Sequence, residues 1–223
     1  MTITEAIKKR ISIRGFKSDP VPKKTLREIL ETAGRAPSAM NIQPWEFTVI
    51  GGNILNKIRS AIVEKLNSGA PAKPDHLGVG WPQDSIFRQR QVGLAKQIFR
   101  IMDIKREDKE KRAWWLERGF RFFDAPATII ITTDSILAES TPLIDIGAVM
   151  QSICLAALDH GLGTCIVDQG VMFPEVLREF AEITENRRII IAIAIGYPDP
   201  DFPANRLEAA REPVDGITQW IGF

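Results

Sequence analysis

Two long aliphatic runs in the second half of the chain constrain its fold more than any other feature of the sequence. The first run spans residues 127–133 and the second spans residues 187–195. Neither run alternates regularly with polar residues, which is typical of strands that are buried on both faces. We therefore expect both runs to lie inside a sheet whose two faces are covered.

The remaining elements follow from hydrophobic periodicity and from turn residues. Helices are expected at residues 2–11, 23–35, 53–66, 84–118 and 142–160, and from residue 174 onward. Two further strands are expected at residues 45–50 and 165–167. The order of helices and strands has no regular βαβ alternation, so the sequence favours an α+β layer arrangement.

The expected helix at residues 142–160 carries apolar residues on almost every side. A helix of this kind must be buried all round, and a dimer interface is one way to bury it in a chain of this size. His160 falls at the C-terminal end of the helix, where the helix dipole favours a cation. We interpret His160 as a capping residue rather than a catalytic one.

Composition argues against several classes of function. The 223 residues suit one domain with an insertion, and a formal net charge of +1 gives no general basic field for nucleic acid. The sequence shows no apolar run of membrane-spanning length and no signal-peptide pattern, so we expect a cytoplasmic protein.

Cys154 and Cys165 lie in apolar surroundings without a CxxC spacing, and His76 and His160 lie in different segments. We therefore expect buried reduced thiols, no metal site and no catalytic triad.

Residues 10–16 read Arg-Ile-Ser-Ile-Arg-Gly-Phe, with two arginines and a hydroxyl at alternate positions. In an extended segment the side chains of Arg10, Ser12 and Arg14 would point the same way. Two guanidinium groups and a hydroxyl suit a phosphate, because the planar fork of arginine matches phosphate oxygens. The alternative is that both arginines are solvated on a surface loop.

A second polar motif spans residues 36–45, which read Ala-Pro-Ser-Ala-Met-Asn-Ile-Gln-Pro-Trp. Pro37, Ser38, Asn41 and Pro44 all disfavour an uninterrupted helix, so we expect a shaped loop between a helix and a strand. Taken alone, this motif is also compatible with an ordinary connecting loop.

Residues 67–118 form an insertion ahead of the first aliphatic run. Its first part, residues 67–83, holds three prolines and three glycines, which predicts a long loop. Its second part is rich in charge and contains Trp114 and Trp115. The two aromatic side chains are either packing anchors or part of a lid that covers an active site and shapes substrate access.

Together, the two polar motifs resemble the front end of the nitroreductase family of FMN-dependent homodimeric flavoenzymes. The likeness continues at His-Gly-Leu-Gly-Thr in residues 160–164, at Ala-Ile-Gly-Tyr-Pro in residues 194–198 and at Arg-Glu-Pro in residues 211–213. It covers residues 1–60 and 120–215, whereas the insertion at residues 67–118 matches no motif of the family. The resemblance implies one FMN-binding domain over residues 1–223, with a mainly antiparallel sheet packed between helices, a helical insertion and a C-terminal arm.

The resemblance also implies where the phosphate end of FMN would bind. Arg10, Ser12 and Arg14 would hold the phosphate and the ribityl chain, and Arg211 would also lie near the phosphate. Ala209 stands where some members of the family have a second basic residue. The phosphate site of this chain would therefore depend more on the two N-terminal arginines.

The isoalloxazine ring would, by the same resemblance, be lined from two directions. The polar loop would supply Pro37, Ser38 and Ala39, and Asn41 of the same loop would reach the flavin that is bound mainly by the other subunit. The opposite edge would face the backbone at Val167, Asp168 and Gln169, where a main-chain N–H can face the flavin N5. The sequence Asp168-Gln169-Gly170 replaces a glycine-rich or Glu-Gly turn of many relatives, so this alignment leaves a shift of one or two residues open.

The implied reaction passes hydride from NADH or NADPH through flavin N5 to an electron-poor acceptor, such as a nitroaromatic or a quinone, in a ping-pong cycle. The chemistry belongs to the flavin, so no catalytic side chain is implied. The sequence has no GxGxxG motif whose acidic residue would indicate NADH or NADPH. The alternatives are a relative with another acceptor (an enone or flavin reductase, a dehalogenase or a flavin-consuming member) and a flavin-binding sensor without turnover. The expected partners are a second copy of the chain and a small-molecule acceptor, with neither nucleic acid nor membrane.

Overall fold

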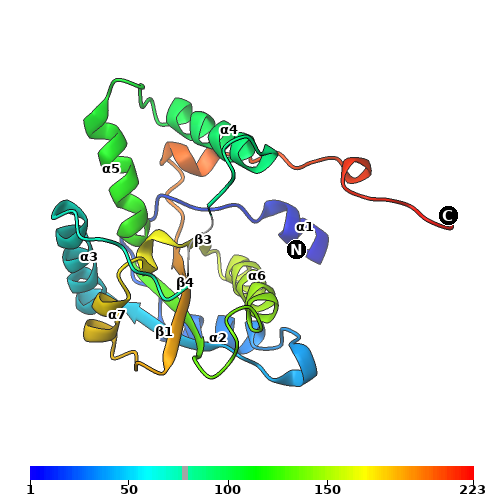
Figure 1. The fold of residues 1–223 in the computed structure, drawn as a ribbon, viewed down its shortest axis with the longest axis horizontal. Coiled ribbons are helices and arrows are strands. Elements are labelled where there is room, and N and C mark those ends of the chain that lie inside the picture. Colours follow the sequence, from blue (N-terminus) through cyan, green and yellow to red (C-terminus); the bar gives the residue numbers. More distant parts are fainter. Residues whose placement is uncertain (77–79) are drawn as a thin grey trace.

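The computed structural model describes residues 1–76 and 80–223. Four strands form one sheet in the order β1-β2-β4-β3, and each neighbouring pair is antiparallel (Figure 1). The strands are β1 (Glu46–Gly51), β2 (Ala127–Asp134), β3 (Gly163–Val167) and β4 (Arg187–Gly196). The two aliphatic runs are therefore the two central strands, as the sequence predicts.

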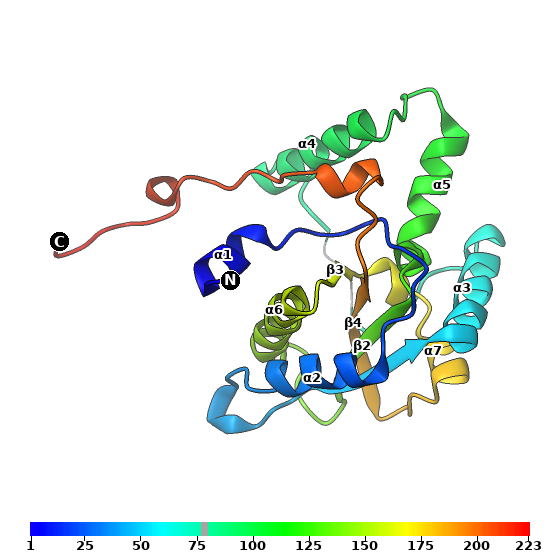
Figure 2. The same cartoon turned by 180° about the vertical axis from the view of Figure 1, so that it is seen from behind.

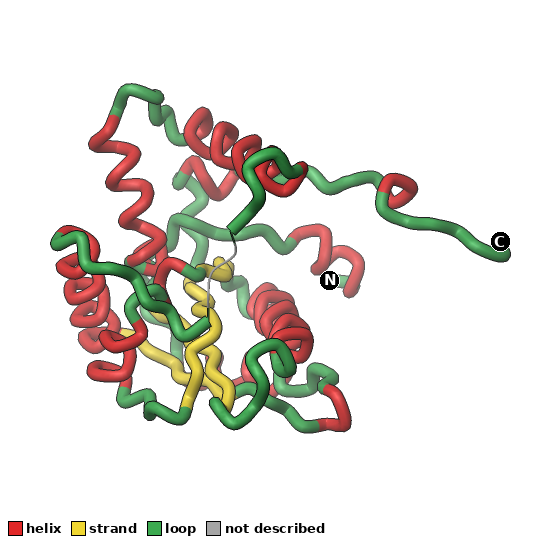
Figure 3. The backbone as a smooth tube through the Cα atoms, viewed as in Figure 1, coloured by secondary structure: helices red, strands yellow, loops and turns green. Residues whose placement is uncertain are grey.

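Helices cover both faces of this sheet (Figure 3). One face packs against α3 (Gly52–Asn67) and α7 (Pro174–Ala181), and the other packs against α2 (Lys23–Ala33) and α6 (Leu143–Asp159). Within β2, Ile130 belongs to the first of these cores, whereas Ile129 and Ile131 belong to the second. Alternate side chains of one strand thus fill two cores, and each such isoleucine contributes roughly 1.5–3 kcal/mol through burial.

The segment that follows the N-terminal helix lies beside the first residues of β3. α1 (Ile3–Lys9) begins after Thr2, whose hydroxyl accepts the N–H of Glu5 while the Glu5 carboxylate accepts the N–H of Thr2. The helix ends two residues before the predicted boundary, and the first polar motif continues as extended chain. The N–H of Ile13 donates to the carbonyl of Thr164 at 2.9 Å, which fixes this extended segment against β3.

The helical stretch expected at residues 84–118 consists of two helices. α4 (Ile86–Ile101) and α5 (Lys109–Phe120) each have their own cap, supplied by the side chains of Ser85 and Asp108. The break falls at residues 102–108, which contain neither glycine nor proline and so gave no signal in the sequence. The loop expected at residues 67–83 starts once α3 has ended, and its residues 77–79 lie outside the described part of the chain.

The C-terminal segment crosses near α4 and then leaves the body of the molecule (Figures 1 and 2). Its last residues expose large apolar side chains, including Trp220 and Phe223. α6 is buried along most of its length, although Ile144 is 85% exposed in the single chain. None of the helices in the described ranges combines the length and the apolar character that crossing a membrane requires.

Candidate active site

The first polar motif lines a cavity of about 950 Å³. Arg10 follows the last turn of α1, and the extended chain after it presents Ser12 and Arg14 to the cavity while Ile13 and Gly15 are buried. Six basic side chains and one carboxylate line the cavity, namely Lys8, Lys9, Arg10, Arg14, Arg206, Arg211 and Glu208. This local excess of positive charge suits an anion, although the net charge of the whole chain is near zero.

A second cavity, of about 390 Å³, adjoins the first because Arg14 and Leu94 line both. Its lining at the end of β3 consists of Val167, Asp168 and Gln169. The structure therefore gathers seven of the predicted site residues around Arg14: Arg10, Ser12, Arg14, Val167, Asp168, Gln169 and Arg211. Arg211 is exposed, and its guanidinium donates to the carbonyls of residues 209 and 210 at 2.8 and 3.1 Å.

α5 forms one wall of the second cavity and packs tightly against the turn that follows β3. The Gln169 side chain donates from Nε2 to the carbonyl of Leu116 at 3.3 Å. A Cβ added at Gly119 would lie 1.8 Å from Gln169 Oε1, so alanine here would require the Gln169 amide to shift. Trp115 lines the same cavity, and its ring centroid lies 6.2 Å from that of Phe123. The insertion thus contributes directly to the wall of the site.

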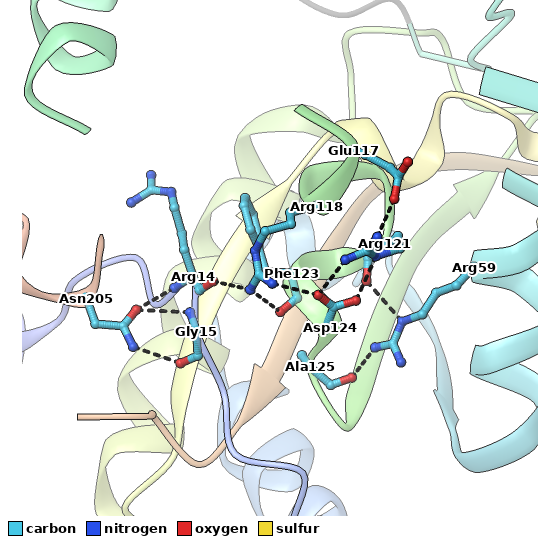
Figure 4. A network of polar contacts seen from close by, with 10 residues as sticks. All are labelled: Arg14, Gly15, Arg59, Glu117, Arg118, Arg121, Phe123, Asp124, Ala125 and Asn205. Carbon is cyan, nitrogen blue, oxygen red and sulfur yellow. Dashed lines mark hydrogen bonds and ion pairs between the residues drawn. The ribbon is translucent and has the colours of Figure 1, made fainter. Parts of the chain in front are cut away.

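Two residues from distant parts of the chain hold the backbone at Arg14 (Figure 4). Asn205 Oδ1 accepts the N–H of Arg14 at 2.7 Å and the N–H of Gly15 at 3.1 Å, and Asn205 Nδ2 donates to the Gly15 carbonyl at 2.7 Å. From the other side, Arg118 Nη2 donates to the Arg14 carbonyl at 2.8 Å. The Arg14 guanidinium lies 6.0 Å from the centre of the Phe123 ring.

Asp124 is the anionic centre of the same network (Figure 4). Its carboxylate accepts from Arg118 Nη1 and from Arg121 Nε, each at 2.8 Å. Burial lowers the pKa of Arg118, and the charge of Asp124 opposes that shift. Phe122, Phe123 and Asp124 all have φ between 52° and 58°, which L-residues rarely adopt. The surrounding arginines hold this unusual turn in place.

The polar loop lies apart from the two cavities in the single chain. In the described residues, the linings of both cavities contain none of Pro37, Ser38, Ala39 and Asn41. The loop is nevertheless well defined, because Ser38 Oγ accepts the N–H of Gln43 at 2.9 Å. Met40, Asn41 and Gln43 have positive φ, and the Met40 side chain is 96% exposed. Pro37, Ala39 and Asn41 are exposed in the single chain, whereas the Ser38 hydroxyl and the Gln43 side chain bond within the loop.

Cys165 lines the second cavity but is almost fully buried. Burial raises the pKa of its thiol to about 11, against the opposing charge of Arg14. Burial likewise raises the pKa of Cys154. Both cysteines are free thiols, as the sequence predicts. A protonated thiol is a poor nucleophile, so neither residue suits covalent catalysis.

Sequence reasoning missed the residues that support the site from a distance. Arg118 was one of many charges in a charged helix, and Asn205 was one polar residue in a polar tail. No local pattern marks either residue, because each acts on a backbone group more than a hundred positions away. Leu94 and Phe123 likewise reach the cavities only through the tertiary fold.

A known family model matches most of the chain. The model of the nitroreductase family matches residues 7–197. The chain therefore belongs to the nitroreductase family and is an oxidoreductase.

Individual relatives extend the similarity over nearly the full length of the chain. It is 60% identical over 221 residues to an NADH dehydrogenase of Thermus thermophilus, covering 97% of this chain and 94% of the relative. It is 31% identical over 222 residues to a nitrobenzene nitroreductase of Ectopseudomonas oleovorans, covering 98% of this chain and 96% of the relative. Among solved structures, the FMN and NADPH-dependent nitroreductase NfnB from Sphigopyxis sp. strain HMH matches with a TM-score of 0.94 at 27% identity, covering 100% of both chains.

Proposed function

We propose that this chain is an FMN-dependent oxidoreductase that passes hydride from NADH or NADPH to an electron-poor acceptor. The observation that carries the proposal is the junction of two cavities at Arg14, one strongly cationic and the other at the end of β3. The phosphate of FMN would bind in the cationic cavity, and the edge of its ring would face the second cavity. The cofactor and donor named for the NfnB structure support the same assignment.

The residues present fit the phosphate end of FMN. Arg10, Arg14 and Arg211 would neutralise the phosphate, and the Ser12 hydroxyl would donate a hydrogen bond beside them. The three arginines occupy a cavity whose size is typical of ligand sites. Bound FMN would supply the ring that takes up hydride from the nicotinamide and gives it to the acceptor. Val167, Asp168 and Gln169 would fix the ring edge, and the α5 wall would limit access of water.

A second copy of the chain would complete the site. The polar loop is largely exposed in the single chain, so Pro37, Ser38 and Ala39 would line the ring of the partner's flavin and Asn41 would contact the same flavin. The exposed Ile144 on α6 and the exposed apolar tail support a homodimer, since a second subunit would cover them. A homodimer would therefore satisfy both the expectation drawn from the polar loop and the one drawn from the apolar helix.

The insertion, residues 67–118, would act as the cover of the site and shape the choice of acceptor. Trp81 and Phe87 line a third cavity, of about 850 Å³, which shares Leu94 and Arg211 with the cationic cavity. Their ring centroids lie 6.4 Å apart. Rings at this spacing contact each other, so a planar acceptor would pack against the pair, and the nitrobenzene named for the Ectopseudomonas relative is planar. A nitroaromatic is therefore the first acceptor to test, followed by a quinone.

The proposal is tested by a visible spectrum of the purified protein, followed by anaerobic titration with NADH and then with NADPH. We expect an FMN spectrum that at least one donor bleaches. Addition of a nitroaromatic or a quinone should then restore the colour. The two donors need separate titrations, because one relative is named for NADH and the NfnB structure for NADPH.

Each other outcome would change the assignment. A folded dimer that stays colourless after reconstitution with FMN would contradict the cofactor. Bound flavin that neither donor bleaches would favour a sensor, and colour restored only by an enone or by free flavin would move the chain to another acceptor class.

A further inference from the structure

We propose that Arg118 and Asn205 are positioning residues that fix the Arg14 side chain in the phosphate site. The inference rests on the proposed function, because it assigns Arg14 to the phosphate of FMN. It adds two residues that act through the backbone of Arg14. Asn205 lines the cationic cavity, but its side-chain amide bonds to backbone groups, and Arg118 is absent from both cavity linings in the described residues. We refer to Arg118 and Asn205 together as the Arg14 clamp.

The clamp holds both polar groups of the Arg14 backbone. Asn205 accepts the Arg14 N–H, and Arg118 donates to the Arg14 carbonyl, at 2.7 and 2.8 Å (Figure 4). Asn205 also anchors Gly15 on both its N–H and its carbonyl, and it donates to the Asp199 carbonyl at 2.8 Å. With both peptide groups fixed, the direction in which the Arg14 side chain leaves the backbone is fixed too.

Arg118 is itself held rigidly. The residue is only 8% exposed, and its guanidinium lies between the rings of Trp114 and Phe202, 5.2 and 4.7 Å from their centres. Beyond the Arg14 carbonyl it donates to the Asp124 carboxylate at 2.8 Å and to the Phe123 carbonyl at 3.2 Å. One planar fork thus serves three acceptors, and an ammonium group cannot reproduce that geometry.

Arg118 also controls the surface on which the Arg14 guanidinium rests. The Phe123 ring lies 6.0 Å from that guanidinium, and Phe123 belongs to the turn with positive φ. Because Arg118 binds both the Phe123 carbonyl and the Asp124 carboxylate, it fixes this turn as well as the backbone of Arg14. The position of Arg14 is therefore determined from two directions by one residue of the insertion.

The chain offers a matched control in Arg59. Arg59 is also a guanidinium with a burial-lowered pKa, and it donates to the carbonyls of Arg121 and Ala125 on either side of the same turn (Figure 4). In the described part of the chain, the hydrogen bonds of Arg59 end on this turn and on Asn56, and none reaches Arg14. Replacing Arg59 with lysine perturbs the turn and leaves both bonds of the Arg14 clamp intact.

The test compares FMN with riboflavin, which lacks the phosphate. Apoprotein is titrated with each ligand by flavin fluorescence for wild type, Arg118→Lys, Asn205→Ala, Arg59→Lys and Arg14→Ala. We expect wild type to prefer FMN, and both clamp variants to lower the FMN-to-riboflavin affinity ratio about tenfold, as for a lost charge-assisted contact. Arg59→Lys should change the ratio less than about twofold, because the Arg14 contacts remain.

A double variant shows whether the clamp acts through Arg14. In the Arg14→Ala background, Arg118→Lys should cause no further loss of the ratio, since the side chain that it positions is gone. Equal ratios in Arg118→Lys, Asn205→Ala and Arg59→Lys would overturn the inference while leaving the phosphate site in place. A wild type without preference for FMN would instead overturn the phosphate site, and the inference with it. Asn205→Ala keeps the test decisive if Arg118→Lys does not fold.

Discussion

The carboxylate of Asp145 accepts the main-chain N–H of Ala39 with both oxygens, at 3.2 and 3.3 Å. Asp145 lies in the first turn of α6 and is 8% exposed. The contact joins the start of the most apolar helix to the exposed polar loop. The loop shape proposed to complete the partner's site thus depends on one buried carboxylate.

We expect Asp145→Ala to destabilise the protein by about 1–2 kcal/mol, through the lost charge-assisted bond and the lost interaction with the helix N-terminus. Asp145→Asn keeps one acceptor oxygen and should cost less. Urea unfolding at neutral pH would measure both variants. Identical unfolding midpoints for wild type and Asp145→Ala would show that the contact contributes nothing to the loop.

Removal of either phosphate-site arginine should weaken FMN binding. Arg14 is partly buried and clamped, so Arg14→Ala should cost about 1.5–3 kcal/mol of binding free energy. Arg211 is exposed, so Arg211→Ala should cost about 1 kcal/mol or less. Equilibrium titration of apoprotein gives both values. Arg106→Ala is the control, since Arg106 is an exposed arginine outside the cationic cavity. Equal affinities in all three variants would mean that the phosphate binds elsewhere.

The Cys165 thiol should make stability fall in alkaline solution. Its pKa rises from 9.0 to about 11 on folding, so the folded state binds more protons than the unfolded state between these values. The contribution of this thiol to the free energy of unfolding is therefore fully present below pH 9. It is lost as the pH rises toward 11, by about 2–3 kcal/mol in total. Urea unfolding at pH 8 to 10.5 should show a steeper decline for wild type than for Cys165→Ala. Parallel slopes would contradict the burial of this thiol.

Two glycines beside the site should differ sharply in their tolerance of alanine. A Cβ at Gly170 would lie 2.2 Å from the fully buried Phe122 ring, so Gly170→Ala should cost about 1–3 kcal/mol through overpacking. At Gly119 the obstacle is the amide end of Gln169, a flexible group that can move. Gly119→Ala should therefore change stability by less than about 1 kcal/mol. Thermal unfolding would check the order, and a larger loss in Gly119→Ala would contradict the packing described here.

Deletion of residues 217–223 should weaken the proposed homodimer. This segment exposes Ile217, Trp220, Ile221 and Phe223. The rings of Trp220 and Phe223 pack edge to face, with their centroids 5.8 Å apart. Side chains of this size are stabilised by burial against another subunit. Sedimentation velocity over a range of concentrations should show a larger dissociation constant for the truncated chain. An unchanged constant would show that the tail takes no part in the dimer.

The central features of the fold could be predicted because their signals are local. The aliphatic runs gave the two inner strands of the sheet, and the alternation in residues 10–16 gave an extended segment with Arg10, Ser12 and Arg14 on one side. Only the fold shows how Arg118 and Asn205 reach Arg14, from 104 and 191 positions away. The break between α4 and α5 could not be predicted from the sequence either, because the residue with positive φ in this connection is Asp103 rather than a glycine.

The packing of α5 against the rest of the site has a consequence for engineering. Arg118, the last residue of the insertion, holds the backbone of Arg14, and Gly119, which follows it in α5, lies against the Gln169 side chain. A chimera that grafts the insertion of another relative onto this chain would lose the Arg118 contact unless the graft kept an arginine at this position. We therefore expect exchange of the whole insertion to disturb the backbone of Arg14, whereas point substitutions on α4 would leave the Arg118 contact in place.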